Sequence, residues 1–178
     1  NGVLLRPLPY PEPDRLVQVW SANPNGIARN GMSPPDFFDI REAAIERRAV
    51  ERMGAFVDDD FTLTAVGGPL HVNAAVVTTG FFDALGVGAA EGRTFLPSDD
   101  DGDAAVVVLS DALWRSRFGA SPGVIGQTVA IDGRSCTIVG VMPSGFGFPS
   151  IETQVWMPLA RSSRSASRGA HFLYAVAR

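Results

Sequence analysis

The segment AAVVVLSDALWRSRFGASPGVIGQTVAIDGRSCTIVGVMPSGFGFP, residues 104–149, decides how the rest of the chain is interpreted. It begins with an apolar run over 104–109 that is rich in β-branched residues and too short to span a membrane, so it predicts a buried strand. Ser110 is a suitable N-cap for a helix over 111–118, and Gly119 can take the left-handed conformation that ends a helix. Strands over 128–131 and 136–141 then flank an Asp-Gly pair, which is typical of a tight hairpin turn.

Trp114 and Phe118 lie four residues apart on the predicted helix and therefore share one face. We expect this face to be buried, in which case Trp114→Ala costs about 3–5 kcal/mol of stability. Nothing in the segment itself indicates chemistry.

Further elements are predicted on both sides of this segment. Ser33, Pro34 and Asp36 begin a helix that continues to about residue 47. Thr79 is a candidate cap for a short helix that carries Phe81, Phe82 and Leu85 and ends at Gly86. The predicted strands cover residues 15–20, 52–57, 61–66, 70–78 and, at the far end of the chain, 172–177.

Without the segment 93–168, the order of elements is that of a split βαβ fold. The sequence thus predicts an α+β protein in which residues 1–92 and 169–178 form one lobe and residues 93–168 form a second lobe inserted before the last strand. The Ser/Arg-rich run 161–169 is then the return linker. We expect the strand 172–177 to pair with strands from the first eighty-odd residues.

The composition is that of a globular protein, with 46% hydrophobic and 19% charged residues among 178. A formal net charge of −4 gives no electrostatic footprint for nucleic acid. Every basic residue is an arginine, so the chain has no phosphate-binding Gly-x-x-x-x-Gly-Lys loop. The single cysteine, Cys136, lies in a predicted strand, which indicates a buried and unreactive thiol.

The most conspicuous polar cluster is Asp99-Asp100-Asp101-Gly102-Asp103. Its carboxylates alternate as in a calcium loop, but Ala104 and Ser110 occupy the positions where an EF-hand needs Gly and Glu. We interpret the cluster as a hydrated turn, with a weak cation site as the alternative. Asp58-Asp59-Asp60 is interpreted as a second acidic turn.

Other candidate motifs have structural interpretations. The run Gly86–Gly92 imitates a dinucleotide-binding fingerprint but follows a helix, so a chain-turning loop is favoured. Ser144 does not lie in a Gly-x-Ser-x-Gly elbow, and Phe146 and Phe148 beside it are expected to be aromatic anchors. His71 and His171 have no ligand spacing around them. We therefore predict no catalytic, cofactor-binding or metal-binding residue.

Five blocks of the sequence, in order, resemble the MacB-like periplasmic core domain of ABC-transporter permeases, especially the duplicated permeases of acidobacterial type. The blocks are LLRPLPYP at 4–11, FFDALGV at 81–87, VVLSDALWRSRFG at 107–119, VIGQTV at 124–129 and IVGVMP at 138–143. The resemblance implies a porter-like α/β lobe that carries an inserted second lobe.

The resemblance also implies a periplasmic, non-catalytic domain of an inner-membrane protein, although the chain shows neither a signal peptide nor an apolar run of about 20 residues. Its expected partners are flanking transmembrane helices, a partner permease domain, in some members a periplasmic adaptor, and a separate ABC ATPase. The domain would transmit conformational change during export and be a monomer when isolated. The main alternative is a ligand-binding or sensing domain with a pocket between the lobes; a hydrolytic enzyme is a third class.

Overall fold

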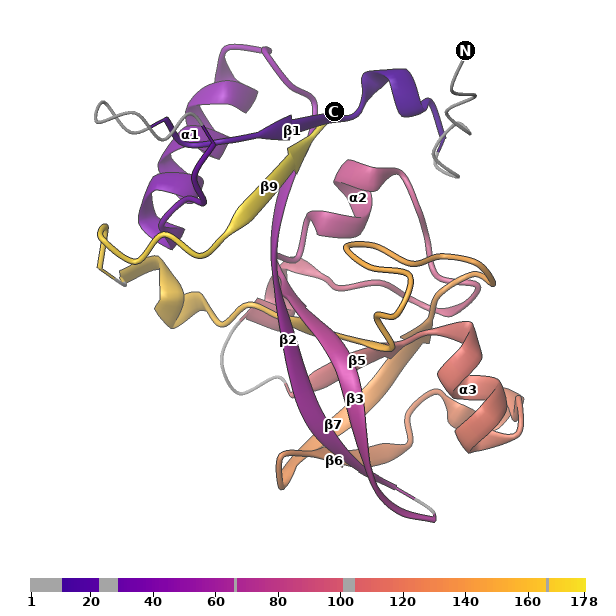
Figure 1. Ribbon diagram of the computed structural model, residues 1–178. Helices are drawn as coiled ribbons and strands as arrows, with labels where there is room; N and C mark the ends of the chain where they lie inside the picture. Colours follow the sequence, from indigo (N-terminus) through magenta and orange to yellow (C-terminus); the bar gives the residue numbers. More distant parts are fainter. Residues whose placement is uncertain (1–10, 23–28, 66, 101–104, 166) are drawn as a thin grey trace, which may run out of the picture.

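The strand, helix and hairpin predicted for residues 104–149 are present in the computed structural model of the chain (Figure 1), which describes residues 11–22, 29–65, 67–100, 105–165 and 167–178. These elements are β5 (Val106–Leu109), α3 (Asp111–Phe118), β6 (Thr128–Ile131) and β7 (Arg134–Val141). The Ser110 hydroxyl accepts a hydrogen bond from the Leu113 amide at 3.1 Å, as an N-cap does. Asp132 and Gly133 both have positive φ, 47° and 80°, which matches a type I′ turn.

The other elements come from the two ends of the chain and from the segment that follows β7. The remaining strands are β1 (Val17–Val19), β2 (Met53–Ala65), β3 (Gly68–Val77), β4 (Glu91–Gly92), β8 (Val155–Pro158) and β9 (Tyr174–Ala177). The remaining helices are α1 (Pro34–Glu46) and α2 (Phe81–Leu85), with 3-10 turns η1 (Pro13–Arg15), η2 (Pro97–Asp100), η3 (Pro122–Val124) and η4 (Arg161–Ser165).

Both N-terminal helices were expected, and each confirms its predicted terminus. The Ser33 hydroxyl accepts the Asp36 amide at the start of α1, and α2 ends at Gly86, whose φ is 72°. The cap predicted at Thr79 is wrong, because Gly80 occupies the N-cap position of α2 and makes no side-chain cap.

β2 is one continuous strand, whereas the sequence predicts two strands separated by an acidic turn. That prediction is wrong because Asp58, Asp59 and Asp60 lie inside β2 and pair with residues 75, 74 and 73 of β3. Aspartate is depleted in strands, but pairing along a long partner strand overrides the weak local preference.

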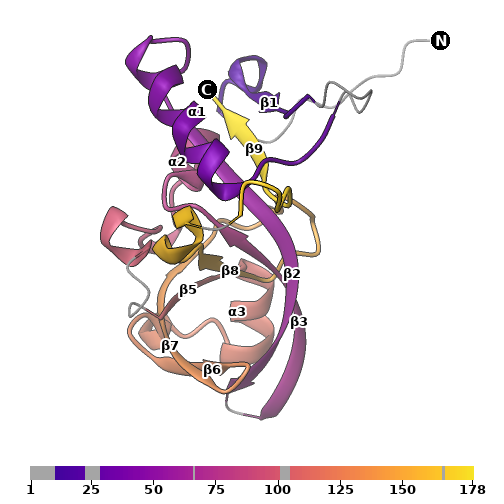
Figure 2. The same ribbon diagram turned by 90° about the vertical axis from the view of Figure 1, so that its left-hand side faces the viewer.

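The nine strands found among the described residues belong to one sheet, and six of them close into a ring in the order β2-β3-β8-β5-β7-β6 and back to β2. β2 connects this ring to an open extension: Met53–Phe56 pair with β9, whereas Leu63 and Thr64 pair with β6. β9 pairs in turn with β1. In Figures 1 and 2 the ring forms the lower part of the molecule, and β1, β9 and α1 form the upper part.

The interior of the ring is an aliphatic cluster. Its members include Leu63, Val72, Val107, Leu109, Ile131, Ile138 and Val155. Leu113 of α3 packs into this cluster with 1% exposure, whereas Trp114 and Phe118 are only partly buried against it. The prediction of a buried Trp114/Phe118 face is therefore wrong in detail, since Leu113 is the residue of α3 that enters the core.

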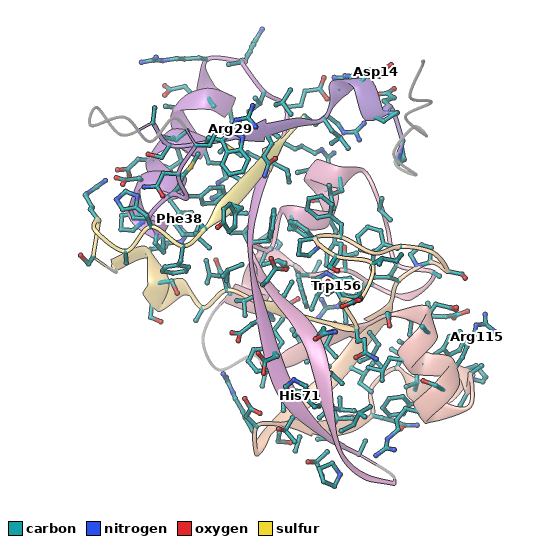
Figure 3. The ribbon with its side chains drawn as sticks, viewed as in Figure 1. Asp14, Arg29, Phe38, His71, Arg115 and Trp156 are labelled. Atoms are coloured by element: carbon teal, nitrogen blue, oxygen red, sulfur yellow. The ribbon has the colours of Figure 1, made fainter. Side chains whose placement is uncertain are left out.

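A second, aromatic cluster lies between α2, the β2–β3 hairpin and the loop before β8. Trp156 is fully buried there (Figure 3), with its ring centroid 6.0 Å from that of Phe82 and 5.4 Å from that of Phe146. Phe146 and Phe148 both pack into this cluster, which confirms them as aromatic anchors. A third cluster joins Phe37 of α1 to the opposite face of β2 and β9.

The C-terminal strand lies where it was predicted, because β9 pairs with β1 and β2 rather than with the β6–β7 hairpin. The mixed α/β class is also confirmed. The finer description as a split βαβ lobe with an inserted lobe is not established, since β2 and β3 run without a break from one part into the other. The division into residues 1–92 with 169–178 and residues 93–168 stays a prediction.

Candidate functional site

The described residues contain no group of three or more His, Cys, Asp or Glu side chains that could hold a metal ion. His71 is exposed on the β2–β3 hairpin (Figure 3), with its Nε2 3.5 Å from Asp60 Oδ2. His171 is also exposed, and its Nδ1 lies 3.2 Å from the Gly31 carbonyl oxygen. The two histidines therefore occupy surface positions, as predicted.

The acidic cluster that begins at Asp99 is not a hydrated turn in its described part. Asp99 is 6% exposed, accepts two hydrogen bonds from the Arg93 guanidinium at 2.6 and 3.3 Å, and accepts the Leu96 amide at 2.8 Å. Asp100 is 7% exposed and accepts a hydrogen bond from Arg164 at 3.2 Å. The prediction of a hydrated turn is wrong for these two carboxylates, because both are buried and bind arginine side chains. Residues 101–104 lie outside the described part of the chain.

The remaining candidate motifs have structural roles. Gly86 ends α2 and leads into the loop before β4, so the glycine run turns the chain as expected. Ser144 is exposed near Asp111 of α3, whose pKa is lowered mainly by Arg115 and to a smaller extent by Ser144. Cys136 is buried inside the ring, and this burial raises the pKa of its thiol.

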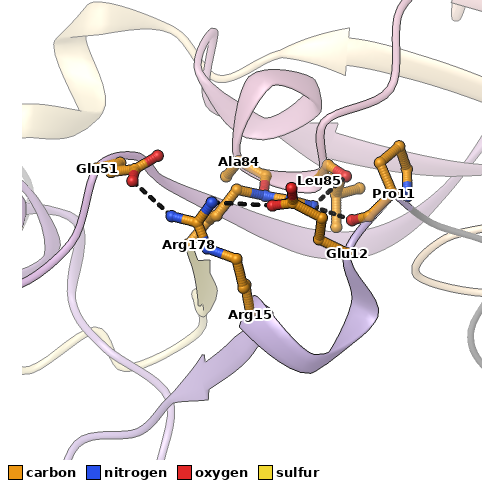
Figure 4. Close-up of polar contacts among 7 residues, drawn as sticks. All are labelled: Pro11, Glu12, Arg15, Glu51, Ala84, Leu85 and Arg178. Atoms are coloured by element: carbon orange, nitrogen blue, oxygen red, sulfur yellow. Dashed lines mark hydrogen bonds and ion pairs between the residues drawn. The ribbon is translucent and has the colours of Figure 1, made fainter.

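Arg178 joins the two ends of the described chain (Figure 4). Its side chain is 9% exposed and donates hydrogen bonds to the carbonyl oxygens of Ala84 at 3.2 Å, Leu85 at 3.0 Å and Pro11 at 2.6 Å. These contacts satisfy carbonyls at the C-terminal end of α2, where a cation is also favoured by the helix dipole. The guanidinium also pairs with Glu12 at 3.3 Å. We call this set the Arg178 cluster; no sequence signal indicated it.

The predicted return linker over 161–169 packs against α1 through two arginines. The Arg164 guanidinium lies 4.2 Å from the ring centroid of Phe38, and Arg168 pairs with Asp36 and with Asp39. The hydrogen bond with the Ser33 hydroxyl and, to a smaller extent, Arg168 lower the pKa of Asp36. The described parts of this segment, residues 161–165 and 167–169, are therefore linked to α1 by charged side chains.

A groove with a volume of about 590 Å³ lies between α1 and the N-terminal end of α2. Its lining residues are Arg41, Glu42, Ile45, Glu46, Glu51, Arg52, Met53, Gly80 and Asp83. We call it the α1–α2 groove. It is shallow and has a charged rim, which is not the form of a buried pocket for a small molecule.

A smaller groove of about 250 Å³ continues from it toward η2 and η4, where the two predicted lobes meet. Arg41, Asp100 and Arg164 line it. Burial and the neighbouring Arg164 lower the pKa of Arg41. The ligand pocket between lobes that the sequence offers as an alternative would lie at this position, but four charged side chains, those of Arg41, Asp83, Asp100 and Arg164, line the space.

Comparison with known proteins gives a consistent assignment. The sequence model of the MacB-like periplasmic core domain matches residues 4–178. The macrolide export ATP-binding/permease protein MacB of Burkholderia thailandensis is 33% identical over 99 residues, which cover 53% of this chain and 15% of that protein. MacB of Chromobacterium violaceum is 33% identical over 108 residues, 58% of this chain and 16% of that protein. The chain thus matches about one sixth of the length of these curated relatives.

Solved structures share the fold at low sequence identity. A permease domain from Porphyromonas gingivalis superposes with a TM-score of 0.68 at 18% identity, over 95% of this chain and 76% of that one. The periplasmic region of MacB from Actinobacillus actinomycetemcomitans gives 0.65 at 15% identity, over 92% and 72%. Among the described residues, no helix is long and apolar enough to cross a membrane. On the family match over nearly its whole length, the chain belongs to the MacB-like periplasmic core domain family.

Proposed function

We propose that this chain is the non-catalytic extracytoplasmic module of an ABC-type permease, and that it contacts partner proteins and transmits conformational change along its length. Membership in the family makes it a periplasmic domain of a MacB-like permease. The partner contacts and the transmission of movement are the proposal. The observation that carries it is the β2–β3 hairpin, which runs from the Arg178 cluster to the far end of the ring.

The hairpin is suited to act as a rigid lever. β2 has 13 residues, which at about 3.3 Å per residue corresponds to a length of ~40 Å. It is paired with β3 over ten positions from Phe56 to Ala65, and its two ends are held on the other edge by β9 and β6. Each of the six ring strands pairs with two ring neighbours, which resists sliding of one strand past the next, although residues 57–61 of β2 pair with β3 alone. Tilting the start of β2 would therefore tilt the whole ring.

The Arg178 cluster supplies the point at which movement would enter. It ties Pro11 and Glu12 to the end of β9 and to the last turn of α2. In the proposal, flanking membrane helices connect at this end of the molecule. Displacement of either helix would then act on β9 and, through its pairing with Met53–Phe56, on β2.

Energy for such movement has to come from another domain or protein, because a chain without lysine has no phosphate-binding loop. A sensing role has less support than partner contacts. The α1–α2 groove is shallow with a charged rim, whereas small-molecule pockets are concave and largely apolar.

Distance measurements in the full-length permease, reconstituted in lipid discs, test the proposal. In the first design, spin labels replace the exposed residues Gln18 and Thr64 of one domain, so that the first distance spans the length of the lever. In the second design, a label replaces Thr64 in each of two neighbouring domains, so that the second distance joins the far ends of the two levers. We expect the first distance to stay constant and the second to differ between ATP-bound and ADP-bound states. A second distance that does not depend on nucleotide, or a change in the first, would refute transmission by a rigid lever.

A further inference from the structure

We propose that the α1–α2 groove binds a basic segment of a protein partner, in which an Arg or Lys side chain lies beside an apolar one. The inference rests on the proposed function, because it names the surface and the partner chemistry of one of the contacts proposed there.

The charge of the groove is unbalanced. Its lining contains four carboxylates and two guanidinium groups, so two minus four leaves a formal charge of −2. Glu51 already pairs with Arg15, and Asp83 pairs with Arg52 at 3.6 Å. The two α1 carboxylates of the lining have no ion-pair partner within 4 Å in the described part of the chain, although the nearby Arg41 guanidinium interacts electrostatically with Glu42.

These residues, Glu42 and Glu46, are exposed and form no ion pair with any other residue in the described ranges. They lie four residues apart on one face of α1, where like charges repel each other. Glu46 is also the last residue of α1, an end of the helix dipole where a negative charge is disfavoured, and Arg47 follows it at the C-cap. A cationic side chain placed between the two carboxylates would relieve both effects.

An apolar contact lies next to this charged pair. Ile45 is 42% exposed on the same wall of the groove, and Met53 of β2 lies beneath it with 3% exposure. An entirely apolar partner would bury the two carboxylates unpaired, at high cost. An anionic partner would be repelled. In a segment with one basic and one apolar side chain, the basic side chain would pair with the carboxylates and the apolar side chain would pack against Ile45.

The position of the groove connects it to the lever. The backbone amides of Glu51 and Arg52 donate hydrogen bonds to the Arg178 carbonyl oxygen at 2.6 and 3.1 Å. The rim of the groove is therefore continuous with the end of the molecule at which the Arg178 cluster lies. A partner bound here would contact α1 and the start of β2 together.

Titration of the ¹⁵N-labelled chain with the peptide Ac-Arg-Leu-Leu-Arg-NH₂ tests the inference, with Ac-Glu-Leu-Leu-Glu-NH₂ as the matched acidic probe. We expect the basic peptide to shift the amide resonances of residues 41–46, 52 and 80–83, with binding that weakens as salt is raised. The double variant Glu42→Gln/Glu46→Gln should raise Kd about three- to tenfold, as expected for two partly exposed ion pairs. Removing two like charges should leave the melting temperature unchanged or raised.

The control is Glu91→Gln/Glu152→Gln, which changes the net charge equally at two exposed sites outside the groove. It should change Kd by less than about twofold. Equal weakening by both double variants, resonance shifts outside the groove, equal binding of the acidic peptide, or no binding at all would each overturn the inference. The distance test in the full-length permease is independent of this titration, so failure of the groove and failure of the lever are distinguishable.

Discussion

Two tryptophans of this domain form a matched pair for testing how the core is organised. Each donates its indole N–H to a backbone carbonyl at 2.9 Å, Trp156 to Phe148 and Trp114 to Ser121. Trp156 is fully buried in the aromatic cluster, whereas Trp114 lies partly exposed at the edge of the ring cluster. The same substitution at both sites therefore separates the effect of burial from that of the hydrogen bond.

Trp156→Phe removes the donor and with it the hydrogen bond to the Phe148 carbonyl, a loss of about 1–3 kcal/mol. The missing part of the indole leaves a small cavity that adds roughly 1 kcal/mol. We expect a total loss of about 3 kcal/mol. Trp114→Phe should cost about 1 kcal/mol or less, because water can reach the Ser121 carbonyl.

The assay is urea unfolding of both variants, followed by far-UV circular dichroism because each change removes a fluorophore. Unchanged m-values would show that both losses reflect stability rather than a different unfolded state. Equal losses at the two sites, or a larger loss for Trp114→Phe, would contradict the assignment of Trp156 to the core.

Asp99→Asn should cost about 2–3 kcal/mol in the same unfolding assay, because it breaks the buried contact with Arg93; a loss below ~0.5 kcal/mol would restore the hydrated-turn interpretation. Gly54→Ala should be strongly destabilising, with a lower melting temperature, since a Cβ at this position would lie 2.4 Å from the Cα of Phe81. Burial raises the pKa of the Cys136 thiol, so the neutral thiol is favoured in the folded state. Stability should be lost as pH rises through that raised pKa, and alkylation by iodoacetamide at pH 8 should be much slower than in urea; equal rates would contradict the burial.

The parts of the fold that the sequence predicts correctly depend on local signals. Ser110 caps α3 and the Asp132-Gly133 pair closes the β6–β7 hairpin through contacts a few residues apart. β8 was not predicted, because it has only four residues, ends in Pro158 and pairs in parallel with β3, about eighty residues away. Closure of the ring depends on such distant pairings, which leave no local pattern.

The same distinction applies to the candidate sites. That this chain has no catalytic residue stays a prediction. The burial of Asp99 and Asp100 could not be predicted, since one of their partners, Arg164, lies 64 residues from Asp100. The Arg178 cluster also joins residues from opposite ends of the chain. Arginines that bind backbone carbonyls at a distance have no characteristic spacing in sequence.

The three consecutive aspartates of β2, which misled the sequence interpretation, have a physical explanation in the way the strand changes partners. β2 leaves β9 after Phe56 and meets β6 only at Leu63, while Thr62 binds Asp132 of the hairpin turn. Between these points residues 57–61 pair on one side only, so this part of β2 is a free sheet edge within the described chain. Exposed edges invite pairing with other strands, and charged side chains oppose it. Asp59 also accepts the backbone N–H of Asp60 at 2.9 Å, which occupies a donor in this stretch. β2 therefore belongs to both the ring and its extension. The acidic side chains between these two paired regions oppose pairing of the free edge with another strand.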